Sequence, residues 1–160
     1  MANGVRLEPV GRVVGGRDEV RDDDWGPVRA VLELDAARFG PEAVAGLAGF
    51  SHLEVVFLFD RVDPAAVEAG ARRPRGNAAW PRVGIFAQRA KDRPNRIGVS
   101  RCRLVGVDGV RLAVEGLDAV DGTPVLDVKP WMAELGPQGA VRQPAWATEV
   151  MAGYWAADPP

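Results

Sequence analysis

Short apolar segments separated by Gly, Pro or Asp dominate the pattern along this chain. Seven of them have the length and the content of Val, Leu and Phe that β-strands favour. They cover residues 10–14, 28–34, 53–59, 83–87, 99–107, 110–114 and 125–128. Asp108 and Gly109 stand between two of these segments and predict a hairpin with a two-residue type I′ turn. The pattern therefore predicts a chain built mainly of β-strands.

Helical signals are few and short. Residues 41–48 begin with Pro41, and residues 65–71 form an alanine-rich segment, so we expect a short helix at each place, covering one opening of the sheet. Parallel strands need crossover helices, which are mostly missing. We therefore predict an all-β protein with minor helices, a small barrel or sandwich of about seven strands, and one domain spanning residues 1–160.

Composition narrows the classes of function that remain. The only cysteine, Cys102, cannot form an intramolecular disulfide, which favours a cytoplasmic location. The N-terminus has no basic segment followed by an apolar one, and no apolar run approaches about 18 residues, so we expect neither export nor a membrane span. One histidine and one cysteine cannot form a metal site, and we expect no metal, although carboxylates could hold magnesium.

Familiar catalytic and cofactor motifs are missing from the sequence. There is no P-loop, no G-x-G-x-x-G after a strand and no G-x-S-x-G elbow. His52 is the only imidazole, and its position directly before an apolar segment favours a capping or strand-entry residue over a catalytic one. An ordinary nucleotide-binding or serine-hydrolase site is therefore not expected.

Basic residues are concentrated in one part of the sequence. Residues 72–103 contain ten of the 20 Lys and Arg residues and a single acid, Asp92, although the whole chain has a formal net charge of -2. A basic strip on an otherwise acidic chain favours an anionic partner.

Residues 84–100, inside this strip, are predicted to form a stiff loop between two strands. Pro94 restricts Arg93 to an extended conformation, while Asn95 and Gly98 can adopt backbone angles that most residues avoid. Arginines on a stiff loop suit the recognition of a carboxylate or phosphate, because a guanidinium offers several donors in a fixed fork. A solvated charged loop is the alternative interpretation.

A second segment, residues 116–131, combines a turn with an unusual strand. Residues 121–124, Asp-Gly-Thr-Pro, are a turn signature. Asp127, Lys129 and Trp131 follow at alternate positions and would face one side of the next strand. They could line a pocket, and a solvated face explains the same spacing.

Three features follow one another in this order: R-P-N-x-I-G-V-S starting at Arg93, a strand hairpin, and G-L-D-x-x-D-G-T-P-V-L-D-V-K-P starting at Gly116. In these features the chain resembles the TsaA-like, or TrmO, family of tRNA adenine methyltransferases. The order and spacing match over most of the chain, including G-F-S-H-L starting at Gly49. The resemblance implies a single-sheeted β-barrel that binds S-adenosylmethionine without a Rossmann fold and works as a homodimer. It also implies methylation of the modified adenosine beside the tRNA anticodon.

Where the motifs match, the resemblance implies roles for individual residues. Contacts to the cofactor are expected from Arg89, Val99, Asp121, Gly122 and Thr123. Asp60 and Arg61 stand where family members often have His-Gln, and we count them among the cofactor contacts. Substrate contacts are expected from the loop residues Arg93 and Asn95 and, on the ground of their alternate spacing, from Lys129 and Trp131. Arg96 replaces the usual second proline, and the early Pro-Arg-Gln cofactor segment of the family is not recognisable in residues 21–27.

Methyl transfer depends mainly on positioning, because the nucleophile must be held in line with the methyl group at about 3–3.5 Å. For an adenine amino group, Asp121 or Asp127 is the candidate to orient the amine or accept its proton. Trp131, Trp146 and Trp155 could stack on a base or pack in the core or an interface.

Two further functions remain open from the sequence. One is methylation of a small molecule or another RNA, because the sequence pI is about 5.5 and the chain is expected to lack the C-terminal extension of many tRNA-acting members. The other is a non-catalytic module that binds S-adenosylmethionine or RNA.

Overall fold

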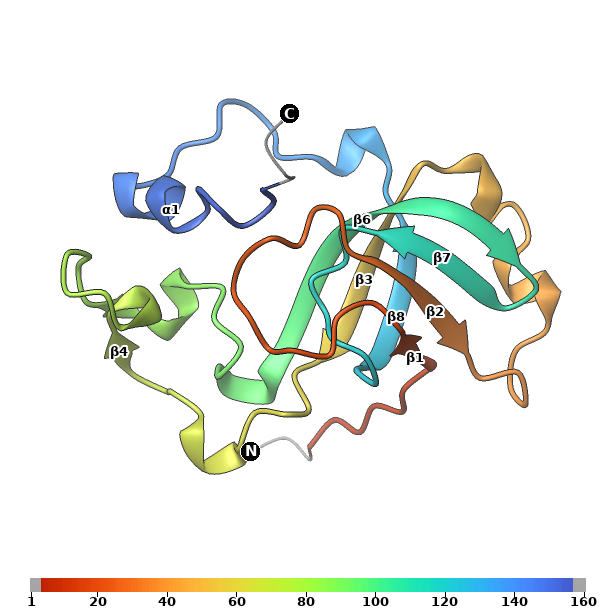
Figure 1. The fold of residues 1–160 in the computed structure, drawn as a ribbon, viewed down its shortest axis with the longest axis horizontal. Helices are drawn as coiled ribbons and strands as arrows, with labels where there is room; N and C mark the ends of the chain where they lie inside the picture. The colour runs from red at the N-terminus through yellow and green to blue at the C-terminus, as the bar shows by residue number, and fades with distance from the viewer. Residues whose placement is uncertain (1–3, 157–160) are drawn as a thin grey trace.

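Six antiparallel strands close into a barrel in the computed structural model, which describes residues 4–156 (Figure 1). Around the barrel the strands follow the order β1-β2-β7-β6-β3-β8. They are β1 (Gly11–Val14), β2 (Arg29–Leu34), β3 (His52–Leu58), β6 (Ile97–Asp108), β7 (Arg111–Glu115) and β8 (Pro124–Pro130). The predicted all-β fold with a small barrel is confirmed, with six strands in the barrel where about seven were expected.

Alternating side chains fill the barrel because successive residues of a strand point to opposite faces. Leu53, Val55 and Phe57 of β3 point inward and are at most 1% exposed, and Leu32 and Leu112 face them from β2 and β7. Burying a side chain of this size contributes about 1.5–3 kcal/mol. The apolar alternation read from the sequence is therefore what closes the barrel.

The long strand β6 joins the two halves of the barrel. Its first part pairs with β3 and its second part with β7, and a register shift between Leu104 and Gly106 marks the bend, as a β-bulge does. The hairpin predicted at Asp108 and Gly109 is confirmed, but Asp108 pairs with Arg111, so the two-residue loop is Gly109–Val110. Only Gly109 has a positive φ (56°), which rules out the expected type I′ turn, because that turn needs positive φ at both central residues.

The predicted strand at residues 83–87 is largely wrong. Only Val83 and Gly84 form a strand, β5 (Val83–Gly84), which pairs with β4 (Ala71–Arg72) in a separate two-stranded sheet. Residues Ile85–Ala87 continue as the 3-10 helix η5. This segment lies away from the barrel, where only two residues of β4 are available as a partner, so its apolar run ends in a helical turn that buries Ile85.

The two predicted helices are shorter than expected. Residues 41–48 form two 3-10 helices, η1 (Pro41–Val44) and η2 (Leu47–Gly49), because Gly46 adopts a φ of 84° between them. In residues 65–71 only η3 (Pro64–Ala66) is helical. The remaining helices, including the one α-helix of residues 4–156, are η4 (Pro74–Gly76), η6 (Pro94–Arg96), η7 (Ala133–Leu135) and α1 (Ala145–Val150).

The segment after α1 returns to the barrel and packs on the β1–β2 connection. Backbone hydrogen bonds run from Asp24 N to Gly153 O at 3.1 Å and from Trp25 N to Tyr154 O at 2.9 Å. Figure 1 shows α1, this returning segment and β4 on the same side of the barrel. Over the range 4–156, no helix is long and apolar enough to cross a membrane.

Candidate functional site

The loop between β5 and β6 has part of the unusual backbone that its sequence predicts. Asn95 and Arg96 have positive φ angles of 64° and 52°. Gly98 does not, and its lack of a side chain serves close packing instead, because an added Cβ would lie 2.4 Å from the ring of Phe57. The loop conformation therefore depends on Asn95 and Arg96, and Gly98 allows β6 to approach the core.

Two arginines of this loop donate hydrogen bonds to neighbouring backbone carbonyls. Arg89 Nη2 donates to the carbonyl of Val99 at 2.8 Å, which brings together two of the predicted cofactor residues. Arg93 Nη1 donates to the carbonyl of Gln88 at 2.7 Å, and Gln88, itself 7% exposed, donates to two further backbone carbonyls. Asn95, the other predicted substrate residue on this loop, is exposed.

The turn before β8 is fixed against the β1–β2 connection. Asp121 Oδ1 accepts from Gly15 N at 2.7 Å, so the carboxylate bonds the β1–β2 connection and not the N–H groups of its own turn. Gly122 has a φ of 83° and donates its N–H to Val13 O at 2.8 Å. Thr123 is 3% exposed. These three residues thus present mainly backbone groups at this end of the barrel.

Arg61 reaches the same turn from the segment after β3. Its Nη2 donates to Asp121 O at 2.9 Å and its Nη1 donates to Asp18 O at 2.7 Å. Asp60 beside it is exposed. The structure therefore brings Arg61 to Asp121, although the two are 60 residues apart in the sequence.

Asp127 and Lys129 stand at alternate positions of β8, as predicted, whereas Trp131 follows directly after the end of the strand. Asp127 pairs with the ammonium of Lys129 at 2.5 Å and accepts from Val128 N at 2.9 Å. The Trp131 ring lies under the guanidinium of Arg101, 4.2 Å from its ring centroid. No hydrogen bond or ion pair of residues 4–156 links this group to Arg89 or Asp121. These residues therefore form a separate group on the outside of the barrel.

A polar pair that the sequence did not single out lies beside Arg89. The hydroxyl of Tyr154 donates to Asp118 Oδ2, and Asp118 Oδ1 is buried without a hydrogen-bond partner among the described residues. Burial, together with the Asp118 carboxylate, raises the pKa of Tyr154 well above its ordinary value, while Arg89 opposes this shift. The hydroxyl therefore stays protonated and remains a donor. Nothing in the sequence pairs the only tyrosine with an aspartate 36 positions away.

Cys102 lies in the barrel core and His52 at the start of β3. Burial raises the pKa of Cys102 to about 12, so its thiol stays protonated at neutral pH and is a poor nucleophile. His52 is the first residue of β3, and its Nδ1 lies 2.8 Å from Ser51 Oγ, which is the predicted strand-entry position. In the part of the chain that the structure describes, no three His, Cys, Asp or Glu side chains are grouped to hold a metal ion.

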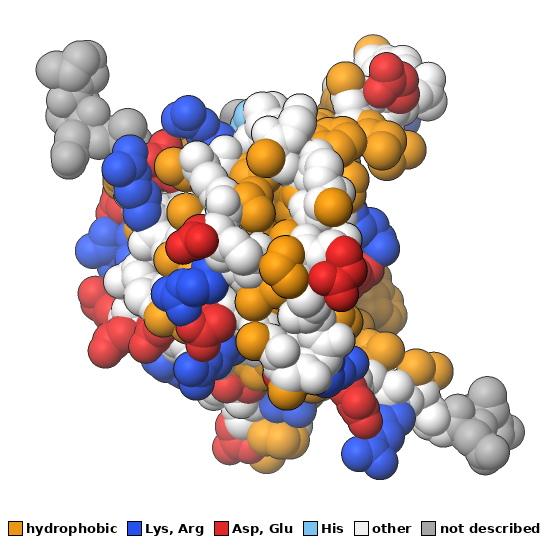
Figure 2. Space-filling model, turned by 90° about the vertical axis from the view of Figure 1, so that its right-hand side faces the viewer, with side chains coloured by type: hydrophobic (Ala, Val, Ile, Leu, Met, Phe, Trp, Pro, Cys, Tyr) orange, Lys and Arg blue, Asp and Glu red, His pale blue; other side chains and the backbone are white. Residues whose placement is uncertain are grey.

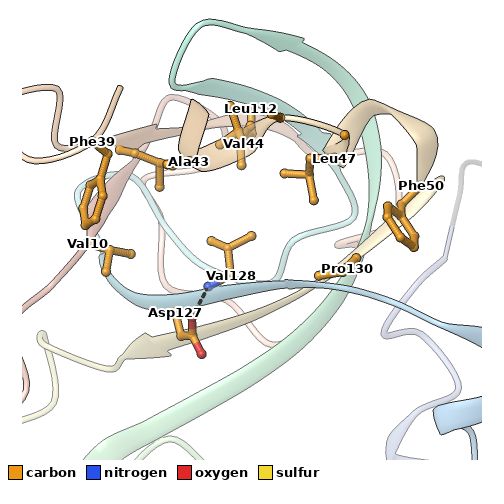
Figure 3. Close-up of a pocket in the computed structure, with 13 residues that line it drawn as sticks. Val10, Phe39, Ala43, Val44, Leu47, Phe50, Leu112, Asp127, Val128 and Pro130 are labelled. Atoms are coloured by element: carbon orange, nitrogen blue, oxygen red, sulfur yellow. Dashed lines mark hydrogen bonds between the residues drawn. The ribbon is translucent and has the colours of Figure 1, made fainter. Parts of the chain in front are cut away.

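An apolar cavity of about 460 Å³ lies elsewhere, between η1, η2 and the barrel. Figure 3 shows apolar side chains such as Phe39, Val44, Leu47 and Val128 around it, whereas the carboxylate of Asp127 points away. Its lining offers little that would orient a polar cofactor. The polar candidates are therefore Arg89 with Val99, Asp118 with Tyr154, and the 121–123 turn with Arg61; no hydrogen bond among residues 4–156 joins Arg89 to the turn.

The fold defines a class: small closed barrels of antiparallel strands with polar groups on the connections between strands. Residues 24–136 match the family model of the tRNA-methyltransferase O N-terminal domain. The chain belongs to this family.

Individual relatives agree with the family match. An Escherichia coli tRNA (adenine(37)-N6)-methyltransferase is 41% identical over 135 residues, covering 78% of this chain and 56% of that protein. A probable S-adenosyl-L-methionine-binding protein of Methanothermobacter thermautotrophicus is 36% identical over 141 residues, covering 84% of this chain and 96% of that protein. A crystal structure of TrmO from Pseudomonas aeruginosa superposes with a TM-score of 0.73 at 30% identity, covering 91% of this chain and 63% of the other.

Coverage of the relatives is uneven. The chain spans about a quarter to two thirds of the length of the curated tRNA methyltransferases it matches.

Proposed function

We propose that this chain is an S-adenosylmethionine-dependent methyltransferase that acts on the exocyclic amino group of the modified adenosine beside the tRNA anticodon. The observation that carries the proposal is the family match over residues 24–136, which contain both Arg89 with its Val99 contact and the 121–123 turn. The E. coli relative bears the name of this activity.

The residues of the site fit the proposed cofactor. A buried carboxylate oxygen without a partner, such as Asp118 Oδ1, is costly unless a ligand supplies a donor, and S-adenosylmethionine carries an ammonium group and hydroxyls. The guanidinium of Arg89 suits a carboxylate, because the contact with Val99 O leaves most of its donors free. When bound, the cofactor supplies an electrophilic methyl group.

The chain's own residues would orient the substrate amine and take up its proton. Of the two candidates, we propose Asp121, because Asp127 is already paired with Lys129. Gly15 N holds Asp121 Oδ1 in place, and Oδ2 would then accept a hydrogen bond from the amine and its proton during transfer. Because positioning supplies most of the rate in such a reaction, a carboxylate fixed by the backbone suits this role.

We also propose that the chain works as a homodimer in the cytoplasm. Phe86 is 77% exposed on the same loop as Arg89, and Val99 is 36% exposed at the start of β6. A second copy that covers these apolar groups would add a wall to the site.

Light scattering tests the dimer. The parent chain should give twice the monomer mass, and the Phe86→Asp variant should give the monomer mass.

The test of the proposed function is methyl transfer from isotope-labelled S-adenosylmethionine to tRNA that does or does not carry the adenosine modification. We expect labelling of the modified tRNA only. Arg89→Gln should weaken cofactor binding at least about tenfold in calorimetry, the scale of a lost hydrogen bond to a charged group. Arg82→Gln, which removes an exposed arginine bonded to Ala71 O, is the matched control and should bind as the parent does.

A second candidate is a module that binds S-adenosylmethionine without catalysis. The name of the Methanothermobacter relative, of which the chain covers 96%, favours it. Cofactor binding in calorimetry with no transfer to any RNA pool would replace the enzyme proposal with this one.

A further inference from the structure

The barrel carries an ordered arrangement of charges on its outer face, built from residues far apart in the sequence. Alternate residues of each strand point outward, and the register of the strands sets bases and acids side by side. We name this group the outer charge ladder. Its members are Arg12, Arg29, Glu33, Glu54, Arg101, Arg103, Arg111, Glu115, Asp127 and Lys129.

One glutamate of the ladder, Glu33 on β2, is held between two arginines. Arg12 lies directly opposite on β1 and pairs with it at 3.0 Å, and Arg111 lies directly opposite on β7 and pairs with the other carboxylate oxygen. These hydrogen bonds and charges hold the pKa of Glu33 below its ordinary value, so the acid stays ionised between its two bases.

The same base-acid-base unit recurs one strand further round the barrel. Glu115 on β7 pairs with Arg29 of β2 at 2.7 Å and with Arg103 of β6 at 3.2 Å. Register again explains the contacts, since both arginines lie directly opposite this glutamate.

A third unit spans the other side of the barrel. Glu54 on β3 pairs with Arg101 of β6 at 3.1 Å, and Lys129 of β8 lies directly opposite Glu54. The ammonium of Lys129 also pairs with Asp127, whose hydrogen bond raises the pKa of Lys129. All three glutamates of the ladder are thus flanked by two bases.

The ladder has more bases than its own acids need. It holds six bases against four acids, a surplus of two positive charges on a chain whose net charge is -2. The side chains of the bases are 46–75% exposed, whereas those of the three glutamates are only 18–30% exposed. On the side of the molecule drawn in Figure 2, basic and acidic side chains are interspersed beside a band of hydrophobic ones. The cations therefore extend outward over recessed acids.

Barrel stability alone does not account for this arrangement. An exposed ion pair adds little stability, and a second base on the same acid also brings two like charges together. What the second base adds is a fixed guanidinium with unused donors facing solvent. Such donors match the oxygens of phosphate groups.

The ladder is continuous with the candidate site. Val99, whose carbonyl accepts from Arg89, stands on the outward face of β6 together with Arg101 and Arg103. A polyanion that enters the site over Val99 would therefore pass along the row of exposed arginines.

We propose that the outer charge ladder is the surface on which the phosphate backbone of the RNA substrate docks, an inference that rests on the proposed function. Of the basic strip of residues 72–103, only Arg101 and Arg103 belong to the ladder. Five other bases of the strip donate to backbone carbonyls instead: Arg73, Arg82, Arg89, Arg93 and Arg96.

The test compares three variants of the full chain for binding to the modified tRNA used in the methylation assay, from about 50 to about 200 mM salt. Arg29→Gln/Arg103→Gln removes both bases around one acid, and Glu115→Gln removes that acid. The matched control, Arg38→Gln/Arg82→Gln, makes the same charge change at two exposed arginines bonded to backbone carbonyls.

The two ladder variants should change RNA affinity in opposite directions. Because each lost phosphate contact removes about 0.7–0.9 from the slope of log K against log salt, the Arg29/Arg103 double variant should lose up to about 1.8 in slope and about tenfold in affinity. Glu115→Gln should bind more tightly than the parent, and the Arg38/Arg82 control should match the parent slope. Cofactor affinity should be unchanged in all three.

Two outcomes would overturn the proposal that RNA docks on the ladder, and they differ in what they say about the proposed function. If the parent methylates tRNA but the Arg29/Arg103 and Arg38/Arg82 variants lose equal affinity and slope, the ladder is wrong and the enzyme proposal stands. If the parent neither binds nor methylates any RNA, both proposals fail. A loss of stability alone cannot imitate the expected result, because removing Glu115 breaks the same ion pairs and yet must strengthen binding.

Discussion

The packing of Gly98 against Phe57 allows a sharp test of the barrel interior beside the candidate site. A Cβ atom added to Gly98 would lie 2.4 Å from Cε2 and 2.5 Å from Cζ of Phe57, which is directly opposite on β3. Carbon atoms in contact are about 3.5–4.0 Å apart, so the ring would have to move by about 1 Å or more. Phe57 is 1% exposed and packs edge-on against Phe59 with 5.1 Å between ring centroids, so little free space is available.

We expect Gly98→Ala to lower the free energy of unfolding by about 1–3 kcal/mol, the usual cost of adding a carbon to a packed core. In a domain of this size that corresponds to a fall of about 2–12 °C in Tm. Because Val99 follows Gly98 and its carbonyl accepts from Arg89, a shift of β6 should also weaken cofactor binding.

Gly106 on the same strand is the matched control. An added Cβ would meet no atom within 4 Å, and Gly106 is not among the residues with positive φ. Gly106→Ala should leave stability unchanged or raise it slightly, because alanine restricts the unfolded chain.

Urea unfolding followed by circular dichroism measures all these variants, and a second substitution checks the cause. Phe57→Leu shortens the ring that Gly98→Ala would strike, so the double variant should be destabilised by less than the sum of the two single changes. If Gly98→Ala and Gly106→Ala unfold at the same urea concentration, the close approach of β6 to Phe57 is not what this glycine provides.

Three further predictions concern the polar groups. Tyr154→Phe should lower the free energy of unfolding by about 1–3 kcal/mol, because Asp118 Oδ2 loses its donor, and a midpoint equal to the parent's would show that this hydrogen bond contributes nothing. Hydrogen bonds from arginines hold the pKa of Glu33 and Glu115 below 4.5, so the stability from these pairs is complete above that pH and is lost as the pH falls through the lowered values. Urea midpoints between about pH 6 and about pH 2.5 should therefore fall less in E33Q/E115Q than in the parent, and parallel curves would contradict the linkage. Cys102, with a pKa of about 12 and 2% exposure, should react with thiol reagents at neutral pH only in urea; rapid labelling of the folded chain would contradict its burial.

The barrel strands could be predicted because each shows the alternation that a half-buried strand requires. The errors have local causes. The apolar run at residues 83–87 resembles a strand, but its partner β4 is two residues long, and a sequence pattern cannot reveal how long a partner will be. The predicted helix at residues 41–48 is broken by Gly46, whose positive φ the pattern could not reveal. Helix α1 has six residues and no side-chain cap at Pro144, so it gave no signal.

The candidate site was predictable where its geometry is local and not where it depends on contacts between distant segments. The 121–124 turn and the loop around Arg93 follow from residues whose backbone preferences are strong, and the structure contains both. The pairing of Tyr154 with Asp118 and of Arg61 with Asp121 depends on how loops meet at one end of the barrel. The spacing of residues in a sequence does not reveal such contacts between loops.

Which basic residues are available to bind an anion also depends on contacts between distant segments. Clustering along the chain identified a strip rich in arginine, but an arginine in a loop has backbone carbonyls close by, and Arg89 and Arg93 donate to them. An arginine on the outer face of a strand has no such acceptor, since the neighbouring carbonyls are bonded within the sheet. Its side chain can pair only with acids across the strand and with solvent. Bases at alternate strand positions opposite a shared acid, such as Arg29 and Arg103 around Glu115, are therefore better candidates for a phosphate-binding surface than a continuous basic run, and they can be recognised only once the strand register is known.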